Sequence, residues 1–89
     1  MVDSNWESIK ARVSIGDLVR VQVTERKPFG LLVVFDGHAG VIERIGLTKD
    51  GYSLDEFGVG STTDATVIGF RDWSKQIELR LPTRVVTNG

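Results

Sequence analysis

Two short segments of the chain interleave aromatic and basic side chains. The residues concerned are Arg26, Lys27 and Phe29 in the first segment, and Arg71, Trp73 and Lys75 in the second. Aromatic rings stack on nucleobases, and neighbouring cations neutralise the phosphates of a single strand. The two segments therefore indicate a groove for single-stranded nucleic acid, provided that the fold exposes them.

Other site chemistry has little support in the sequence. The chain has no cysteine, which excludes disulfides, thiolate metal sites and a cysteine nucleophile. Its one histidine, His38, follows the turn residues Asp36 and Gly37, where water is not excluded. The Gly58-Val59-Gly60 segment lacks the glycine spacing and the lysine of a phosphate loop. We therefore expect a protein that is not an enzyme and that uses no metal, cofactor or small-molecule substrate.

The composition is that of one small globular domain. The 89 residues are 40% hydrophobic and 26% charged, and we expect one domain over residues 1–89, with its core in 6–82 and a frayed tail. The absence of cysteine and of a signal-like N-terminus favours the cytoplasm. The longest apolar run, residues 31–35, is too short to span a membrane. The net charge of −1 limits non-specific attraction to phosphate, so the distribution of the bases matters more than their number.

The elements that must position these residues are mostly strands. A helix is predicted over residues 5–12, because Trp6, Ile9 and Val13 recur at nearly helical spacing. Alternating or apolar patterns predict strands over 18–25, 29–35, 40–44, 64–70 and 76–81. Asp36-Gly37 predicts a tight hairpin between the second and third strands. Residues 48–63 are predicted to be a long connection with a helical turn at 53–57.

Five strands with a long connection between the third and the fourth favour a closed barrel. The sequence thus predicts an all-β, five-stranded antiparallel barrel of the oligonucleotide-binding (OB) type with a short N-terminal helix. The side chains expected inside it are Val19, Val21, Val23, Val33, Ile42, Val67, Ile77 and Leu79.

The order of several motifs resembles one RNA-binding repeat of ribosomal protein S-one, over about residues 6–81. The matching residues are Trp6, Ile9, Gly16-Asp17, Val19, Val23, Pro28-Phe29-Gly30-Leu31-Leu32-Val33, Gly40-Val41-Ile42, Val67, Gly69, Asp72 and Gln76-Ile77-Glu78-Leu79. The resemblance implies a binding face in which Phe29 is the first aromatic and Asp72 the acidic residue. The second aromatic position holds Leu32, the histidine position holds Glu43 and the basic position holds Gln76.

Two functions remain open at this point. The first is a module that binds single-stranded RNA weakly, with Phe29 and Trp73 stacking and with Arg20, Arg26, Lys27, Arg71 and Lys75 contacting phosphates. The alternative is a protein-interaction module within a ribonucleoprotein, translation or ribosome complex. It is suggested by the low pI and by an apolar strip of Leu32, Val34 and Val41 beside Glu43.

Overall fold

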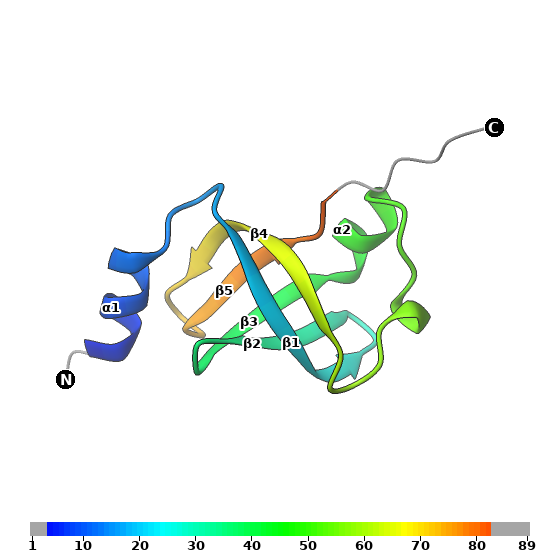
Figure 1. Cartoon of the computed structure of the whole chain (residues 1–89), viewed down its shortest axis with the longest axis horizontal. Helices are drawn as coiled ribbons and strands as arrows, with labels where there is room; N and C mark the ends of the chain where they lie inside the picture. Colours follow the sequence, from blue (N-terminus) through cyan, green and yellow to red (C-terminus); the bar gives the residue numbers. More distant parts are fainter. Residues whose placement is uncertain (1–3, 83–89) are drawn as a thin grey trace.

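The computed structural model describes residues 4–82, and the predicted frayed tail at 83–89 lies outside the described residues (Figure 1). In chain order the elements are α1 (Ser4–Arg12), β1 (Leu18–Lys27), β2 (Gly30–Phe35), β3 (His38–Glu43), α2 (Arg44–Lys49), the 3-10 helix η1 (Leu54–Glu56), β4 (Thr62–Arg71) and β5 (Gln76–Arg80). The N-terminal helix, the five strands and the capped turn at Ser53 are confirmed. Within residues 4–82, no helix is long and apolar enough to cross a membrane.

The five strands close into a barrel in the order β1-β2-β3-β5-β4. Four neighbouring pairs are antiparallel, but β3 and β5 run parallel, with Val41 opposite Glu78. The prediction of a barrel is confirmed, whereas its description as entirely antiparallel is wrong for this pair. A closed ring with an odd number of strands cannot alternate direction throughout, so one parallel pair must remain.

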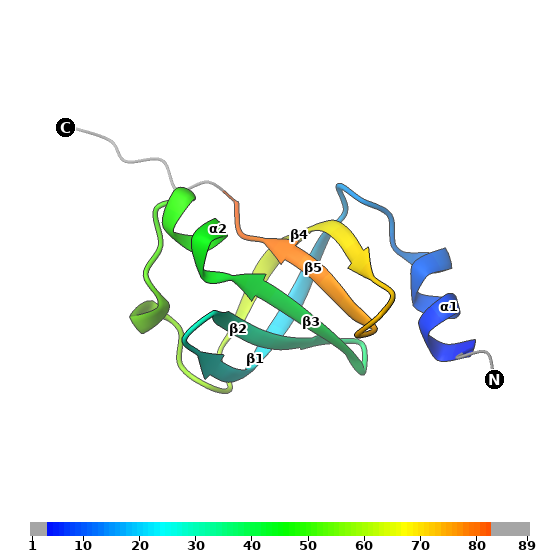
Figure 2. The ribbon, with the colours of Figure 1, turned by 180° about the vertical axis from the view of Figure 1, so that it is seen from behind.

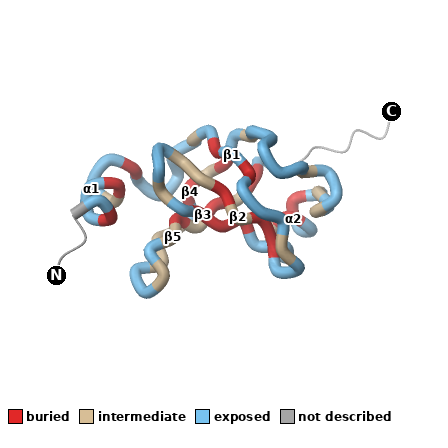
Figure 3. Tube along the Cα trace, turned by 90° about the horizontal axis from the view of Figure 1, so that it is seen from below, coloured by how far each residue is buried: buried red, intermediate tan, exposed pale blue. Residues whose placement is uncertain are grey.

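The barrel interior follows the predicted alternation (Figure 3). Seven of the eight predicted interior side chains are buried, and Val19 is half-buried and packs against them. The sequence left the orientation of β4 least certain. Val67 is fully buried and Ile68 is exposed, and an irregularity of the strand register falls between Val67 and Gly69.

A helix lies at each end of the barrel (Figures 1 and 2). Trp6 and Ile9 form the buried face of α1, and Val13, directly after the helix, is also buried. The Trp6 ring meets Phe70 edge to face, with 6.0 Å between ring centroids. At the other end Leu47 of α2 is buried in the core. Helix α2 is not predicted by the sequence, because a six-residue helix that contains a glycine and two β-branched residues has little helical signal of its own.

The hairpins at both ends of β2 set the geometry of the site. Asp36 and Gly37 have φ angles of 50° and 79°, as a two-residue turn with two left-handed positions requires. At the other end, Pro28 and Phe29 form the turn between the paired residues Lys27 and Gly30. A Cβ atom on Gly30 would lie 2.2 Å from the carbonyl oxygen of Ile42, so only glycine permits this close approach of β2 to β3.

Candidate nucleic-acid interface

Phe29 lies in the turn before β2, with its ring exposed. Its side chain is 56% exposed, so it does not plug the barrel. The backbone N–H of Arg44 donates a 2.7 Å hydrogen bond to the Phe29 carbonyl oxygen, which fixes the turn against the start of α2. An open groove, here called the Phe29 groove, lies between these two segments. Its lining includes Pro28, Phe29, Glu43, Arg44, Thr48 and Arg71.

Arg71 joins the Phe29 groove to the turn between β4 and β5. Its Nε donates a 2.6 Å hydrogen bond to Glu78 Oε1, and its Nη2 donates to Glu43 Oε1. The guanidinium also lies 5.9 Å from the centroid of the Trp73 ring. Arg71 therefore lines the groove that holds Phe29 and lies near Trp73, but two carboxylates already neutralise its charge.

The turn between β4 and β5 exposes the second predicted aromatic. Trp73 is 83% exposed, the largest exposed fraction among the large hydrophobic residues that the structure describes. Lys75 is exposed in the same turn and has a φ of 53°. A tryptophan ring presented to water beside two cations is suited to stack on a planar group.

Asp72, the acidic residue that the resemblance places in the binding face, bonds to α1. Its Oδ1 accepts a 2.8 Å hydrogen bond from the indole Nε1 of Trp6 and a 2.7 Å hydrogen bond from Lys10 Nζ. The hydrogen bonds from Lys10 and then from Trp6 lower the pKa of Asp72, and the same contact with Asp72 raises the pKa of Lys10. Asp72 thus fastens the helix to the hairpin that carries Trp73.

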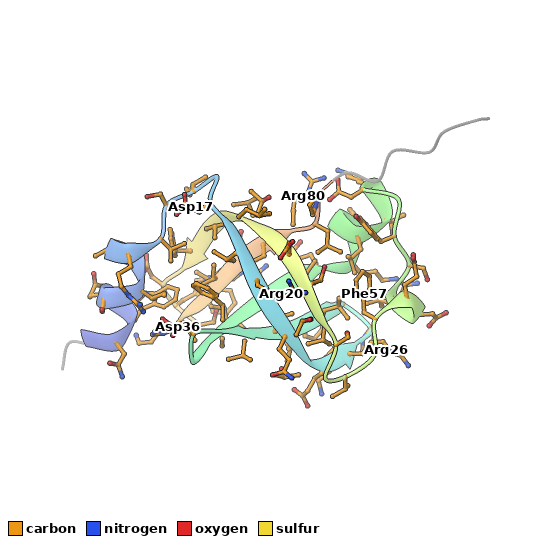
Figure 4. All side chains as sticks on the ribbon, viewed as in Figure 1. Asp17, Arg20, Arg26, Asp36, Phe57 and Arg80 are labelled. Atoms are coloured by element: carbon orange, nitrogen blue, oxygen red, sulfur yellow. The ribbon has the colours of Figure 1, made fainter. Side chains whose placement is uncertain are left out.

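The remaining predicted residues do not line the Phe29 groove. Arg20 lies on β1, on the near face of Figure 4, and its Nη2 is 3.5 Å from Thr62 Oγ1. Figure 2, from behind, shows β3 and β5 on the opposite face. The Nη1 atom of Arg26 is 3.5 Å from the carbonyl oxygen of Phe57; both residues are labelled in Figure 4.

Two more predicted residues stand beside the groove without lining it. Lys27 pairs with Gly30 across the Phe29 turn, and its Nζ is 3.5 Å from Glu25 Oε1. Leu32 is half-buried on β2 and pairs with Val41 of β3. The structure therefore places Arg71 at the Phe29 groove and also beside Trp73, whose turn carries Lys75. It leaves Arg20, Arg26 and Lys27 outside the groove.

Helix α2 contributes two residues to the groove that the sequence did not predict there. Arg44 and Thr48 line the Phe29 groove, because α2 begins directly after β3 and turns along the barrel end. The one local signal was the change from apolar residues to the charged residue Arg44. Arg44 was predicted to end the third strand, whereas it begins α2.

A second, smaller pocket of about 190 Å³ adjoins the Phe29 groove. It lies between α2 and the outer faces of β3, β5 and β4, and we call it the β5 pocket. Its lining includes Val41, Glu43, Ile45, Lys49, Ile68 and Glu78. Glu43 and Ile45 line both hollows, so the two form one continuous surface. Val41, predicted to be exposed in an apolar strip, is instead buried at 1% exposure, because α2 and the neighbouring strands cover it.

Comparison with known proteins identifies the fold. No protein-family model matches the chain, and no curated protein matches it in sequence. The uncharacterized protein MJ1198 of Methanocaldococcus jannaschii is similar in structure, with a TM-score of 0.67 and 17% identity over 78% of this chain and 92% of that one. GSP13 of Bacillus subtilis has a TM-score of 0.66 and 21% identity over 76% of this chain and 55% of that one.

A third similar structure comes from a complex that contains RNA. It is a chain of the a/eIF2alpha–aDim2p–rRNA complex of Pyrococcus horikoshii, with a TM-score of 0.66 and 18% identity over 78% of this chain and 44% of that one. This chain therefore spans less than half of that relative. The three likenesses confirm the small OB-type barrel expected from the resemblance to ribosomal protein S-one, and at these identities they concern the fold.

Proposed function

We propose that this domain binds single-stranded RNA across the face that holds Phe29, Arg71 and Trp73. The observation that carries the proposal is the position of Arg71, which reaches the Phe29 groove and also lies 5.9 Å from the Trp73 ring. Two exposed rings with a cation between them match the alternation of bases and phosphates along a strand. The similarity of the barrel to a chain in an rRNA-containing complex supports the proposal.

Each part of the face has a separate task. Phe29 and Trp73 are exposed and offer stacking surfaces, each of the kind worth about 1–3 kcal/mol per base. Arg44, from the start of α2, adds a cation next to Phe29. Lys75 adds another in the Trp73 turn. Because these cations are few and the net charge is −1, affinity should be weak and should fall as salt rises.

Two acidic residues of this face, Glu43 and Glu78, should lower its affinity for RNA. Glu43 and Glu78 both accept hydrogen bonds from Arg71, so a phosphate must compete with two internal carboxylates for this guanidinium. Glu43 also lines the groove and repels a phosphate that enters it. The domain should therefore bind RNA less tightly than a repeat with a histidine at position 43.

Fluorescence anisotropy of a short, labelled, unstructured RNA tests the proposal. Binding should be measurable at low ionic strength and should weaken at physiological ionic strength. A duplex of the same length serves as the competitor, and it should compete poorly because its bases are not free to stack. Absence of binding at low ionic strength, or equal competition by the duplex, would contradict the proposal.

A protein partner is the second candidate, and one observation favours it. Ile45 and Ile68 are 63% and 43% exposed, and both line the β5 pocket beside the carboxylates of Glu43 and Glu78. Apolar side chains rimmed by charges are common in protein interfaces. Unlike the strip predicted from the sequence, in which Leu32 and Val34 are half-buried, this surface is centred on α2 and β4.

A further inference from the structure

The β5 pocket differs in chemistry from the Phe29 groove beside it. Its exposed apolar walls are Ile45 of α2 and Ile68 of β4, and the buried side chains of Val41 and Leu79 lie beneath them. Its charged margin holds two carboxylates, Glu43 and Glu78, and two cations, Lys49 and Arg80, of which Arg80 is paired with Asp50. With a volume of about 190 Å³, it suits one planar ring system rather than a length of strand.

The walls of the pocket are fixed before any ligand arrives. Arg80 of β5 bonds to Asp50, just after α2, through Nη2–Oδ1 and Nε–Oδ2 distances of 2.7 and 3.1 Å. The side chain of Asp50 is only 5% exposed, so this bidentate pair is firmly held. It ties α2 to β5 and keeps Ile45 and Lys49 opposite the strands. A preformed pocket lowers the entropy lost on binding.

Arg71 also fixes the direction of the Glu78 carboxylate. Its Nε donates to Glu78 Oε1, and the side chain of Glu78 is 34% exposed. A carboxylate has about four lone-pair sites, so the hydrogen bond from Arg71 leaves Glu78, which lines the pocket, with acceptor capacity. An ionised carboxylate can only accept hydrogen bonds. Held in one direction, it therefore favours a ligand whose facing edge carries hydrogen-bond donors.

We propose that the β5 pocket binds a guanine base of the bound RNA, with Glu78 as the specificity-determining residue. The inference rests on the proposed function and deepens it. Among the four bases, only guanine presents two adjacent donors, N1–H and N2–H, on its Watson–Crick edge. Adenine, cytosine and uracil each place an acceptor beside a donor there, which a carboxylate repels.

The other groups of the pocket are consistent with guanine. Guanine carries its O6 acceptor next to N1–H, and Lys49 provides a cation on the helix side of the pocket. The exposed side chains of Ile45 and Ile68 offer apolar contact to the ring. Since Glu43 and Ile45 line both hollows, a strand stacked on Phe29 can place a neighbouring base in the pocket without leaving the surface.

Oligouridines with one central substitution test the inference on the whole domain. The probes are oligo(U) and the same oligomer with one guanosine, adenosine, cytidine or inosine. The guanosine oligomer should bind about tenfold more tightly than oligo(U), as expected for one bidentate base contact. Inosine lacks the N2 amino group, so it should lose most of this gain.

Variants then assign the preference to the pocket. Glu78→Gln should abolish the guanosine preference, while Asp64→Asn, which neutralises an exposed acid on β4, should preserve it. Because Glu78→Gln also alters Arg71, the readout is the ratio of guanosine to uridine affinity and not the affinity itself. Ile68→Ser, which changes one exposed wall and leaves Glu78 and Arg71 in place, should reduce the same ratio.

The outcomes separate the two proposals. If all oligomers bind with equal affinity, the pocket is not a guanine site, although the RNA-binding function stands. The same conclusion follows if the guanosine preference persists in both Glu78→Gln and Ile68→Ser. If no oligomer binds at low ionic strength, the proposed function fails and the inference with it. A protein partner whose binding is lost in Ile68→Ser, with RNA affinity unchanged, would assign the pocket to protein recognition and overturn the inference.

Discussion

Arg71, at the end of β4, reaches across the outer face of β5 and donates a hydrogen bond to Glu43, the last residue of β3. The pair joins two strands that are not neighbours in the barrel, with Glu78 of the intervening strand as a second acceptor. The side chain of Arg71 is 20% exposed, whereas that of Glu43 is 51% exposed. The cation near both aromatic segments is thus already paired with carboxylates in the free domain.

Glu43 should therefore weaken RNA binding. We expect Glu43→Gln to raise the RNA affinity about twofold to fivefold, the range for one partly exposed charge pair. Glu43→His, which adds a donor, should raise it further, and both gains should shrink as salt rises. Anisotropy titrations at two ionic strengths measure this, with Asp64→Asn, on the β1–β4 side of the barrel, as the control. An RNA affinity that is unchanged in both variants, together with a weakened protein complex, would favour the protein-interaction alternative.

Phe29 should supply one stacking contact. Removing the ring in Phe29→Ala should weaken RNA binding by about 1–3 kcal/mol, because the turn presents the ring to solvent and little else replaces it. Val59→Ala is the matched control, since Val59 is 69% exposed but lies on the connection before β4. Both variants should keep the melting temperature close to that of the wild type. A folded Phe29→Ala protein with full affinity would remove Phe29 from the site.

The two tryptophans should respond differently to RNA. Trp6 is 4% exposed beneath the barrel and Trp73 is 83% exposed. Stacking of a base on Trp73 should quench the intrinsic fluorescence with the same Kd as anisotropy reports. In Trp73→Phe the quenching should disappear, while weakened binding persists in the anisotropy assay. Equal quenching in Trp73→Phe would show that the signal comes from Trp6 and that Trp73 lies outside the interface.

The contact of Asp72 with α1 should make stability depend on pH in acid. The pKa of Asp72 is lowered from its ordinary value of 3.8 by the hydrogen bonds from Lys10 and Trp6, so the folded state holds the charged form more strongly than the unfolded chain does. This stabilisation is present above pH 3.8 and is lost as the pH falls through the folded pKa. The pKa of Lys10 is raised, so the same contact has the opposite pH dependence in base. Its stabilisation is present below pH 10.5 and is lost as the pH rises through the folded pKa of Lys10.

Thermal unfolding of Asp72→Asn measures this contribution. The variant should unfold at a lower temperature than the wild type near neutral pH, and the difference should shrink as the pH falls below 3.8. Asp64→Asn, which removes an exposed acid on β4, serves as the control. A difference between Asp72→Asn and the wild type that stays constant down to low pH would argue against the proposed hydrogen bonds.

The sequence predicted the strands better than it predicted the site. Alternating valines and the Asp36-Gly37 turn specify strands and a hairpin locally, so these elements were found. The six-residue helix α2 depends on burial of Leu47 in the barrel end, a tertiary contact without a local signal. Because this helix was not predicted, the positions of Arg44 and Thr48 in the Phe29 groove could not be predicted either. The pairing of Arg71 with Glu43 was equally out of reach, because it joins residues 28 positions apart.

Backbone amide chemical-shift mapping with a short unstructured RNA at low salt tests the central claim most directly. We predict progressive shifts at Phe29, Arg44, Arg71 and Trp73, with the β1 residues around Arg20 unchanged on the opposite side of the barrel. The affinity from these shifts should decrease with added salt. Shifts confined to the β1–β4 side, or no shifts at all, would contradict the assignment of this face to RNA.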